Sequence, residues 1–504
     1  MKKFKTIVFL LVAGMLATGA CNSPSQDGGG ATSQAQEMTE NADAAKQEDK
    51  TAIETLAVPR QDFGGYEFKV LRPTNHAGRG EDEVSPEEEI GDPINDAVYK
   101  RTKLAEEHLK VKVKSITSGE TDDAKIMKHI KNSVAAGMME FDAIVDCNFV
   151  QRRLLQEGML ANLYGVPNID LGKPWWDQRQ IENMSFENKK LYYISGDINY
   201  YDKYGIFLIY FNKKLLSESG IDYPYESVRQ GKWTFDKFTE LAKGFTKDTN
   251  GDGRLDEDDQ WGVAIGASAV PEFLVGFGEK IISLDDGGIP YLRTTEMNHI
   301  NAVEKLGAFF SDANSVLMAE RKKQFNKIIN GDAYNNILQR FKDGRVLMYT
   351  SSIAQIPALR DMNDDFGLLP YPKRDEAQKE YYHFTSWYWA TSYSIPTTND
   401  NLERTGAILE TMAAYSVDTI TPAVIDVSLK SKFARDEESA EMLALIFNAK
   451  SYEISYEYGI GGAYGIYCDV SINGAGNVVS KLEKSKDADQ KALDKFIAAI
   501  AKLP

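Results

Sequence analysis

The hydrophobic and polar positions of the chain first alternate with the period of β-strands. "YEFKVL" (66–71) and "VKVKSI" (111–116) place apolar residues at every second position, as half-buried strands do. "FDAIVD" (141–146) has the short apolar run of a buried strand. We therefore predict three strands in this region.

Helical periodicity occupies the segments between these strands. "DPINDAVYKRTKLAEEHL" (92–109) begins with Asp92 as its expected N-cap and Pro93 in the first turn. "DDAKIMKHIKNSVAAG" (122–137) ends at Gly137 and carries Ile126, Ile130 and Val134 on one face. The order β-α-β-α-β predicts an α/β fold with a mostly parallel sheet wrapped by helices.

A second region of the same kind begins near residue 204. "YGIFLIYFNKKLLSESG" (204–220) reads as a strand that continues into a helix. "TFDKFTELAKGF" (234–245) has helical periodicity, and "WGVAIG" (261–266) reads as a strand. We find no internal repeat and no glycine-rich phosphate loop in the sequence.

The N-terminus predicts export and a lipid anchor. Residues 1–21 have a basic start, an apolar stretch and small residues before Cys21, which resembles a bacterial lipoprotein cleavage site. The alternative is an ordinary secretory signal with a chance cysteine. Residues 22–56 contain no aromatic residue and consist mainly of small, polar and acidic residues, so we expect a disordered tether.

Composition narrows the class of protein. The 504 residues are 42% hydrophobic and 11% aromatic, which is enough for two or three cores, and the net charge is −17. This charge makes nucleic acid an unlikely partner. After lipidation of Cys21 only Cys147 and Cys468 remain, and the sequence leaves open whether they form a disulfide bond.

An acidic run between the helix at 234–245 and the strand at 261–266 has the spacing of a calcium loop. "DTNGDGRLDEDD" (248–259) has oxygen-bearing side chains at loop positions 1, 3, 5, 9 and 12, with Gly253 at position 6. A solvated acidic turn is the alternative. A calcium-sensor EF-hand needs a second helix that can move, but here a strand follows the loop. We therefore expect the ion to have a structural role. The predicted calcium ligands are Asp248, Asn250, Asp252, Arg254 through its carbonyl, Asp256 and Asp259.

Several segments in a fixed order resemble the extracellular solute-binding proteins of bacterial ABC importers, in particular the sugar-binding group of clostridial lipoproteins. They are "DPINDAVYKR", "VAAGMMEFDAIV", "FLIYFNKKLLSESGID", the stretch from "GKWTFDKF" through the acidic loop to "WGVAIG", "FKDGRVLMYTSS", "FGLLPYPKR" and "YSIPTTNDN". The resemblance implies a two-lobed periplasmic-binding-protein-like fold, a solute held between the lobes, permease partners in the membrane, attachment to the outer face of the cell membrane and no catalysis.

The resemblance also places the lobes. It implies crossovers between the lobes near 204–210, 341–350 and 391–397. The first lobe would comprise 57–206 and 347–395, and the second 207–346 and 396–504.

Polar residues after strands and exposed aromatic residues are the candidates for solute contact. Asn75 and Asp146 follow predicted strands, where ligands of α/β sheets bind, although plain loop polarity explains them equally well. Aromatic rings stack on the flat C–H faces of sugars. We favour "DINYYD" (197–202) and "SWYW" (386–389), with strand alternation placing Trp387 and Trp389 on one face, and treat "WWD" (175–177) as structural. The predicted ligand residues are Asn75, Asp146, Tyr200, Tyr201, Asp202, Trp387, Trp389 and Tyr464.

These observations predict capture of a carbohydrate, more specifically an oligosaccharide, for import. Alternatives are a non-sugar solute and an exported glycoside hydrolase, although no acidic pair is marked as catalytic and the sequence has neither G-x-S-x-G nor a zinc-type spacing among its five histidines. A dockerin-like adhesion module would need a second copy of the calcium loop, and the sequence has one.

Overall fold

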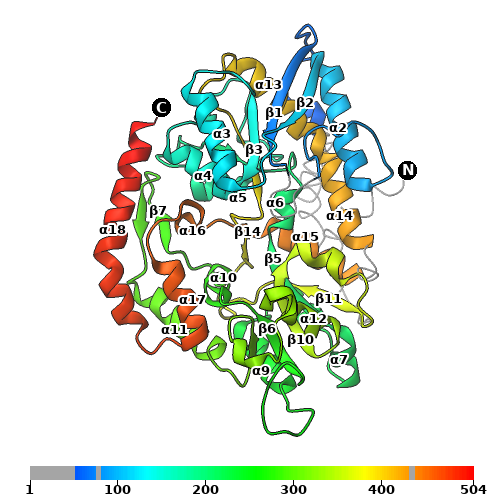
Figure 1. Ribbon diagram of the computed structural model, residues 1–504, viewed down its shortest axis with the longest axis vertical. Helices are drawn as coiled ribbons and strands as arrows, with labels where there is room; N and C mark the ends of the chain where they lie inside the picture. The colour runs from blue at the N-terminus through cyan, green and yellow to red at the C-terminus, as the bar shows by residue number, and fades with distance from the viewer. Residues whose placement is uncertain (1–51, 75–80, 431–436, 504) are drawn as a thin grey trace, which may run out of the picture. The chain divides into compact units, whose positions relative to one another are not determined.

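The computed structural model describes residues 52–74, 81–430 and 437–503. Within these residues the strands form two five-stranded sheets and two short pairs (Figure 1). The signal segment 1–21 and most of the tether lie outside the described residues. At the end of the predicted tether, however, Ala52–Thr55 forms a 3₁₀ turn, and Ala52 and Leu56 pack against the core.

The first sheet has the strand order β2-β1-β3-β13-β4. β1 pairs in parallel with β2 and β3, whereas β13 is antiparallel to β3 and β4. Its strands are β1 (Tyr66–Arg72), β2 (Val111–Thr117), β3 (Ala143–Cys147), β4 (Tyr193–Ile194) and β13 (Thr391–Ser394). The three strands predicted from periodicity are thus confirmed as neighbours in one mostly parallel sheet.

The second sheet has the order β11-β5-β10-β6-β9. β10, β6 and β9 are parallel, and β5 runs antiparallel to both of its neighbours. Its strands are β5 (Phe207–Asn212), β6 (Trp261–Ile265), β9 (Val316–Met318), β10 (Val346–Ser352) and β11 (Phe366–Leu369). The short pairs are β12 (His383–Phe384) with β14 (Lys450–Ser451), and β7 (Ile282–Leu284) with β8 (Pro290–Leu292).

Helices cover both sheets, and local sequence explains several of their ends. Asp92 caps α2 by accepting the N–H groups of Ile94 and Asn95, as predicted, and Thr234 caps α9. The helices are α2 (Pro93–Leu109), α3 (Asp123–Ala135), α4 (Asn148–Gln156), α5 (Gln178–Met184), α6 (Tyr201–Tyr204), α7 (Lys213–Glu218), α8 (Tyr225–Arg229), α9 (Phe235–Phe245), α10 (Ala269–Gly276), α11 (Met297–Phe310), α12 (Ala333–Lys342), α13 (Leu402–Val417), α14 (Ile420–Lys430), α15 (Glu437–Asn448), α16 (Ile454–Tyr458), α17 (Ala463–Asn473) and α18 (Val478–Lys502).

The strand pairing differs from the predicted lobe boundaries in two places. Residues 347–395 were expected in the first lobe, but β10 pairs along its length with β5 and β6, and β11 pairs with β5, so both belong to the second sheet. Residues 396–504 were expected in the second lobe, but α13 and α14 pack against α2 of the first. The segment at 341–350 is therefore not a crossover.

Two segments connect the sheets and lie side by side. The chain leaves the first sheet after β4, passes through α6 and enters β5; it returns between β11 and β13. Ile206 forms an isolated bridge with Thr385, and the Ser386 N–H donates to the Gly205 carbonyl at 2.9 Å. A Cβ atom on Gly205 would lie 2.8 Å from the Ala390 nitrogen, so this approach requires glycine.

Both cysteines among the described residues are thiols. Cys147 is buried at the end of β3 and Cys468 is half-buried on α17, and they do not form a disulfide bond with each other. Among the described residues, no helix is both long and apolar enough to cross a bilayer.

Candidate solute-binding site

A cavity of about 270 Å³ lies at the carboxyl edge of the second sheet. Residues after β6, the end of β10 and the start of α12 line it, together with Phe207 of β5 and Trp389 of the returning segment. The lining residues are Phe207, Gly266, Ser268, Glu272, Asp332, Tyr334, Asn335, Leu338, Tyr349, Thr350, Ser351, Ser352, Gln355 and Trp389. This edge is where α/β sheets bind ligands, and the volume is near the lower limit for small-molecule sites.

Glu272 is the most deeply buried charged group of this cavity. It lies on α10 with 2% of its surface exposed, and its carboxylate accepts from the Ser268 Oγ at 2.5 Å and the Tyr371 Oη at 2.6 Å. Burial raises the pKa of Glu272 to about 7, and the nearby Glu320 acts in the same direction. The carboxyl group therefore changes charge close to neutral pH.

Tyr334 of α12 lines the cavity. Its Oη donates to Glu320 Oε1 at 2.7 Å, and the Ala267 N–H donates to Glu320 Oε2 at 2.7 Å. The phenol lies across Gly266, where a Cβ atom would come within 2.3 Å of the Tyr334 Oη. A larger residue at position 266 would therefore collide with the Tyr334 ring.

Thr350 supplies a hydroxyl group without a partner. It lies in β10, lines the cavity and is 5% exposed, and its Oγ1 makes no hydrogen bond to another described residue. A buried hydroxyl group without a partner costs free energy, which a solute hydroxyl group would recover.

Trp389 is the predicted aromatic residue that lines the cavity, but the predicted strand around it is wrong. Ser386–Trp389 forms a turn between β12 and β13, closed by the Trp389 N–H donating to the Ser386 carbonyl at 3.2 Å. Strand alternation therefore does not apply, and Trp387 points elsewhere. Its ring contacts Phe384, Tyr456 and Tyr464 at centroid distances of 5.9, 5.8 and 5.3 Å.

Tyr464 lies near the cavity without lining it. It is at the start of α17 and packs on Trp387 and Tyr456. Burial is the main reason that its pKa is raised, with smaller contributions from Cys468 and from Glu272 of the cavity. The structure thus brings Trp387 and Tyr464 together beside the cavity.

The predicted segment "DINYYD" lies in a packed core instead. Tyr200 and Tyr201 are 1% and 7% exposed, their ring centroids are 4.3 Å apart, and they pack with residues of α2 and α14. Asp202 is fully buried beside them. None of the three lines the cavity.

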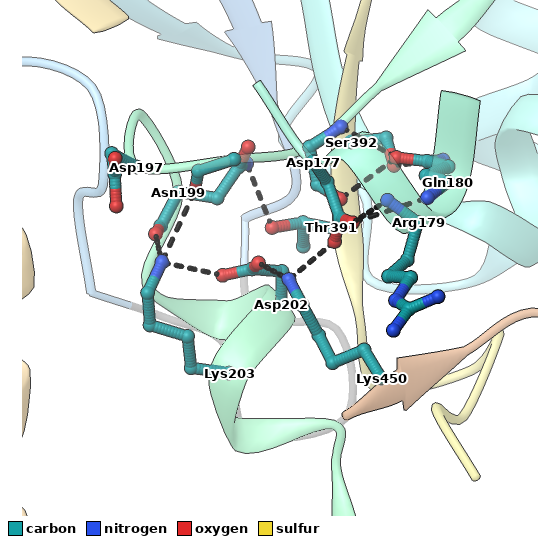
Figure 2. Close-up of polar contacts among 12 residues, drawn as sticks. Asp177, Arg179, Gln180, Asp197, Asn199, Asp202, Lys203, Thr391, Ser392 and Lys450 are labelled. Carbon is teal, nitrogen blue, oxygen red and sulfur yellow. Dashed lines mark hydrogen bonds and ion pairs between the residues drawn. The ribbon is translucent and has the colours of Figure 1, made fainter. Parts of the chain in front are cut away.

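Asp202 belongs to a compensated cluster of buried charges, shown in Figure 2. Lys450 Nζ donates to Asp202 Oδ2 at 2.9 Å and also pairs with Asp177, while Lys203 Nζ pairs with Asp202 Oδ1 at 3.2 Å. Burial disfavours the charges of both Asp177 and Lys450, but their attraction outweighs it, so the pKa of Asp177 is lowered and that of Lys450 raised. A recess of about 520 Å³ adjoins the cluster.

The remaining predicted residues lie apart from the cavity. Trp175 and Trp176 are buried, in agreement with a structural role, and Trp176 Nε1 donates to Glu410 at 2.8 Å. Asp146 is buried in β3, where its carboxylate accepts the Cys147 N–H at 2.7 Å. Asn75 and Cys21 lie outside the described residues.

Three residues that line the cavity, Glu272, Tyr334 and Thr350, were not among the predicted ligand residues. Glu272 had a readable signal, because it is the one acid in the apolar helix "AVPEFLVG", and a buried carboxyl group needs a reason. The other two depend on which strands and helices meet at the cavity.

The acidic loop adopts the turns that its spacing predicts. Asp248 accepts the N–H groups of Gly251 at 2.6 Å and Gly253 at 2.9 Å, and Gly253 has a φ of 80°. Asp252 accepts the N–H of Arg254 at 2.8 Å, Asn250 that of Asp252 at 2.9 Å, and Asp259 those of Thr249 and Asp256. Oxygen donors fit calcium. Among the described residues, no three acidic, histidine or cysteine side chains converge as metal ligands, so calcium stays a prediction.

Two sheets joined by crossing segments, with an aromatic and polar cavity at a sheet edge, fit a binding protein for a small solute. A family model described as bacterial extracellular solute-binding protein matches residues 101–419, more than half of the chain. The chain therefore belongs to the family of bacterial extracellular solute-binding proteins. The narrower clostridial placement stays a prediction.

Solved structures agree on the fold. The chain resembles an extracellular solute-binding protein from Staphylococcus aureus in complex with maltose, at 13% identity and a TM-score of 0.54, over 85% of this chain and 98% of that one. An ABC substrate-binding protein from Listeria monocytogenes in complex with cycloalternan gives 13% identity and a TM-score of 0.52, over 85% and 99% of the two chains. A cyclo/maltodextrin-binding protein complexed with maltotetraose gives 12% and 0.52, over 91% and 98%. No curated protein sequence matches this chain.

Proposed function

We propose that this protein captures a carbohydrate for an ABC importer and delivers it unchanged to the permease. The cavity at the edge of the second sheet carries this proposal, because it combines Trp389 with carboxyl and hydroxyl groups such as Glu272 and Thr350. Sugars need an apolar ring surface and polar partners for their hydroxyl groups. Proteins of similar fold were solved with maltose, cycloalternan and maltotetraose. An oligosaccharide would place one part of its length in this cavity.

The proposed binding step is a hinge closure around the crossing segments. Gly205 and Ala390 approach closely where the two segments run side by side. Small-angle scattering with a bound sugar should show a smaller radius of gyration than without it. An unchanged radius with a sugar demonstrably bound would contradict the hinge.

The function itself is tested by a binding screen. Purified protein is screened by thermal shift against mono- and oligosaccharides, with peptides and polyamines as controls, and positive sugars are measured by calorimetry. Chromatography of the sugar after incubation should recover it unchanged, which separates a receptor from a glycoside hydrolase. A screen in which only peptides or polyamines bind would reject the carbohydrate.

The location that we propose is the outer face of the cell membrane, through a lipid on Cys21. The lipoprotein-like residues before Cys21 support this proposal. Cell fractionation should find the wild type with membranes and Cys21→Ser in the medium or periplasm. Membrane association of Cys21→Ser would contradict the anchor.

We also propose that the loop at 248–259 holds a structural calcium ion. The spacing of its oxygen donors and the turn at Gly253 support it. A dissociation constant of ~10 µM would give about 2.7 kcal/mol of added stability at ~1 mM calcium. Chelation should therefore lower the melting temperature of the wild type but not of the double variant Asp248→Ala, Asp252→Ala. Equal melting of the wild type with and without chelator would show that the loop holds no ion.

A further inference from the structure

Both charged residues that line the cavity are acidic, and Arg321 is a cation that interacts with their neighbour Glu320. The two lining acids are Glu272 and Asp332, and Glu320 is hydrogen-bonded to the lining residue Tyr334. No lysine, arginine or histidine occurs among the described residues that line the cavity. This contrasts with the cluster around Lys450, where each buried carboxylate has an ammonium partner.

The buried carboxylate of Glu272 is held by hydrogen bonds from uncharged side chains. Its two hydrogen-bond donors, Ser268 and Tyr371, are neutral, and no described residue forms an ion pair with its carboxylate. The other titratable groups on which Glu272 acts are a carboxyl group, phenols and a thiol, none of which can carry a positive charge. From the elements packed around it, these groups are Glu320, Tyr334, Tyr349, Tyr371, Tyr464 and Cys468.

A second observation, on Thr350, favours a polar occupant of the cavity. The Thr350 hydroxyl group is buried at the cavity wall and has no partner among the described residues. Trp389, which also lines the cavity, provides an apolar surface. A solute that satisfies the cavity would therefore carry a ring, a hydroxyl group and a positive charge.

We propose that the solute is a saccharide with a protonated amino group, an amino sugar, whose ammonium pairs with Glu272 and its acidic neighbours. This inference rests on the proposed carbohydrate function and narrows it. An ammonium among carboxylates gains charge-assisted hydrogen bonds, whereas a uronate or a sugar phosphate would meet only like charge. The cavity thus selects by charge among sugars of similar shape.

The pH dependence follows from the same geometry. Because the pKa of Glu272 is raised to about 7, the carboxyl group is largely neutral at pH 5.5 and increasingly charged at pH 7 and above. A sugar ammonium, which titrates in the range of an α-amino group at about pH 7.7–8, is mostly protonated between pH 5.5 and pH 7. The preference for an amino sugar should therefore strengthen between pH 5.5 and pH 7.

The experiment compares four forms of the same sugar. Calorimetry measures α- and β-linked glucose disaccharides in neutral, amino, N-acetylamino and uronate forms. On any skeleton that binds, we expect the amino form to bind at least about tenfold more tightly than the neutral and N-acetyl forms at pH 7. The uronate form should be weakest.

Variants assign the preference to named groups. Glu272→Gln should reduce the preference and remove its change with pH, and Asp332→Asn, which keeps an N-cap acceptor for α12, should reduce it less. Glu304→Gln, an exposed acid on α11, should retain the wild-type preference. Melting curves of each variant identify any that fails to fold.

The outcomes separate the two proposals. Neutral or uronate forms that bind as tightly as the amino form, or a tenfold preference that survives in both Glu272→Gln and Asp332→Asn, would overturn the amino-sugar inference while leaving carbohydrate binding intact. Spermidine binding as tightly as the amino sugar would also overturn it, because the sugar would then contribute nothing. If no sugar of any charge binds, the proposed function itself fails.

Discussion

Two groups of buried carboxylates in this protein are opposites in their surroundings. Asp177 and Asp202 in the first lobe are buried against Lys450 and Lys203, and their charges are compensated within the chain. Glu272 in the second lobe is equally buried, but only a hydroxyl group and a phenol hold it. A charge that has its partner inside the chain belongs to the structure. A buried carboxylate without a cationic partner in the chain can instead pair with a positively charged group of a solute.

The largest expected effect comes from removing the compensation in the first lobe. Lys450→Met leaves Asp177 buried without an ammonium and Asp202 with Lys203 alone, which should lower the free energy of unfolding by about 3–5 kcal/mol. Adding Asp177→Asn should restore much of this loss, because the unpaired carboxylate is then gone, whereas Asp202 keeps its pair with Lys203. Denaturant unfolding measures both, with the exposed Lys484→Met as control.

A small effect of Lys450→Met would show that the cluster is solvated and that the contrast with Glu272 is false. Sugar affinity, measured where the variant is folded, should not change. If it falls, the cluster and its neighbouring recess belong to the solute site.

Removing the carboxylate of Glu272 should raise stability near neutral pH, whereas removing Lys450 should lower it. The folded-state pKa of Glu272 is about 7, above the ordinary 4.5, so the folded protein holds this proton more tightly than the unfolded chain does. The stability that Glu272 contributes is therefore present below about pH 4.5 and is lost as the pH rises to about 7, by up to about 3 kcal/mol. Glu272→Gln should melt higher than the wild type at pH 8.

This gain should shrink as the pH is lowered toward 4.5, where the carboxyl group of the folded wild type is neutral as well. Melting curves from pH 4.5 to pH 8 provide the measurement, and Glu304→Gln should follow the wild type throughout. A Glu272→Gln variant that is less stable than the wild type at every pH would mean that the carboxylate is compensated after all.

The smallest expected effect concerns the aromatic residues. Trp389→Ala should weaken sugar binding about tenfold, roughly 1.4 kcal/mol, with little change in melting temperature, because Trp389 lines the cavity. Trp387→Ala should mainly lower stability, because its ring packs on Phe384, Tyr456 and Tyr464. Calorimetry and melting curves of both variants separate these roles. The reverse result would move the solute to the Trp387 side.

The elements that sequence alone predicts well are those with local causes. α2 begins where Asp92 can cap it and Pro93 fits its first turn, β1 and β2 follow their alternation, and β3 follows its short apolar run. The order of the family-like segments likewise predicts two lobes. The helix and the strands depend on residues close together in the chain, whereas the two lobes are implied by the resemblance over most of the chain's length.

Features that depend on distant pairing are the ones that sequence reasoning misses. β10 has the same apolar run whichever sheet it joins, so its pairing with β5 and β6 cannot be read locally. Asp202 looks like a ligand residue until Lys450, 248 positions later, is found beside it. Trp389 was identified for a wrong reason, because it reaches the cavity from a turn and not from a strand.

The distribution of tryptophans has a practical consequence. Of the six in the chain, Trp175, Trp176, Trp233 and Trp261 are at most 2% exposed and lie in cores. Trp389 lines the cavity, and Trp387 packs beside it. A molecule entering the cavity would alter the polarity around these two indoles and leave the other four as a constant background. The protein thus carries its own optical probe of occupancy, so that the emission spectrum can follow binding without a dye, label or engineered residue.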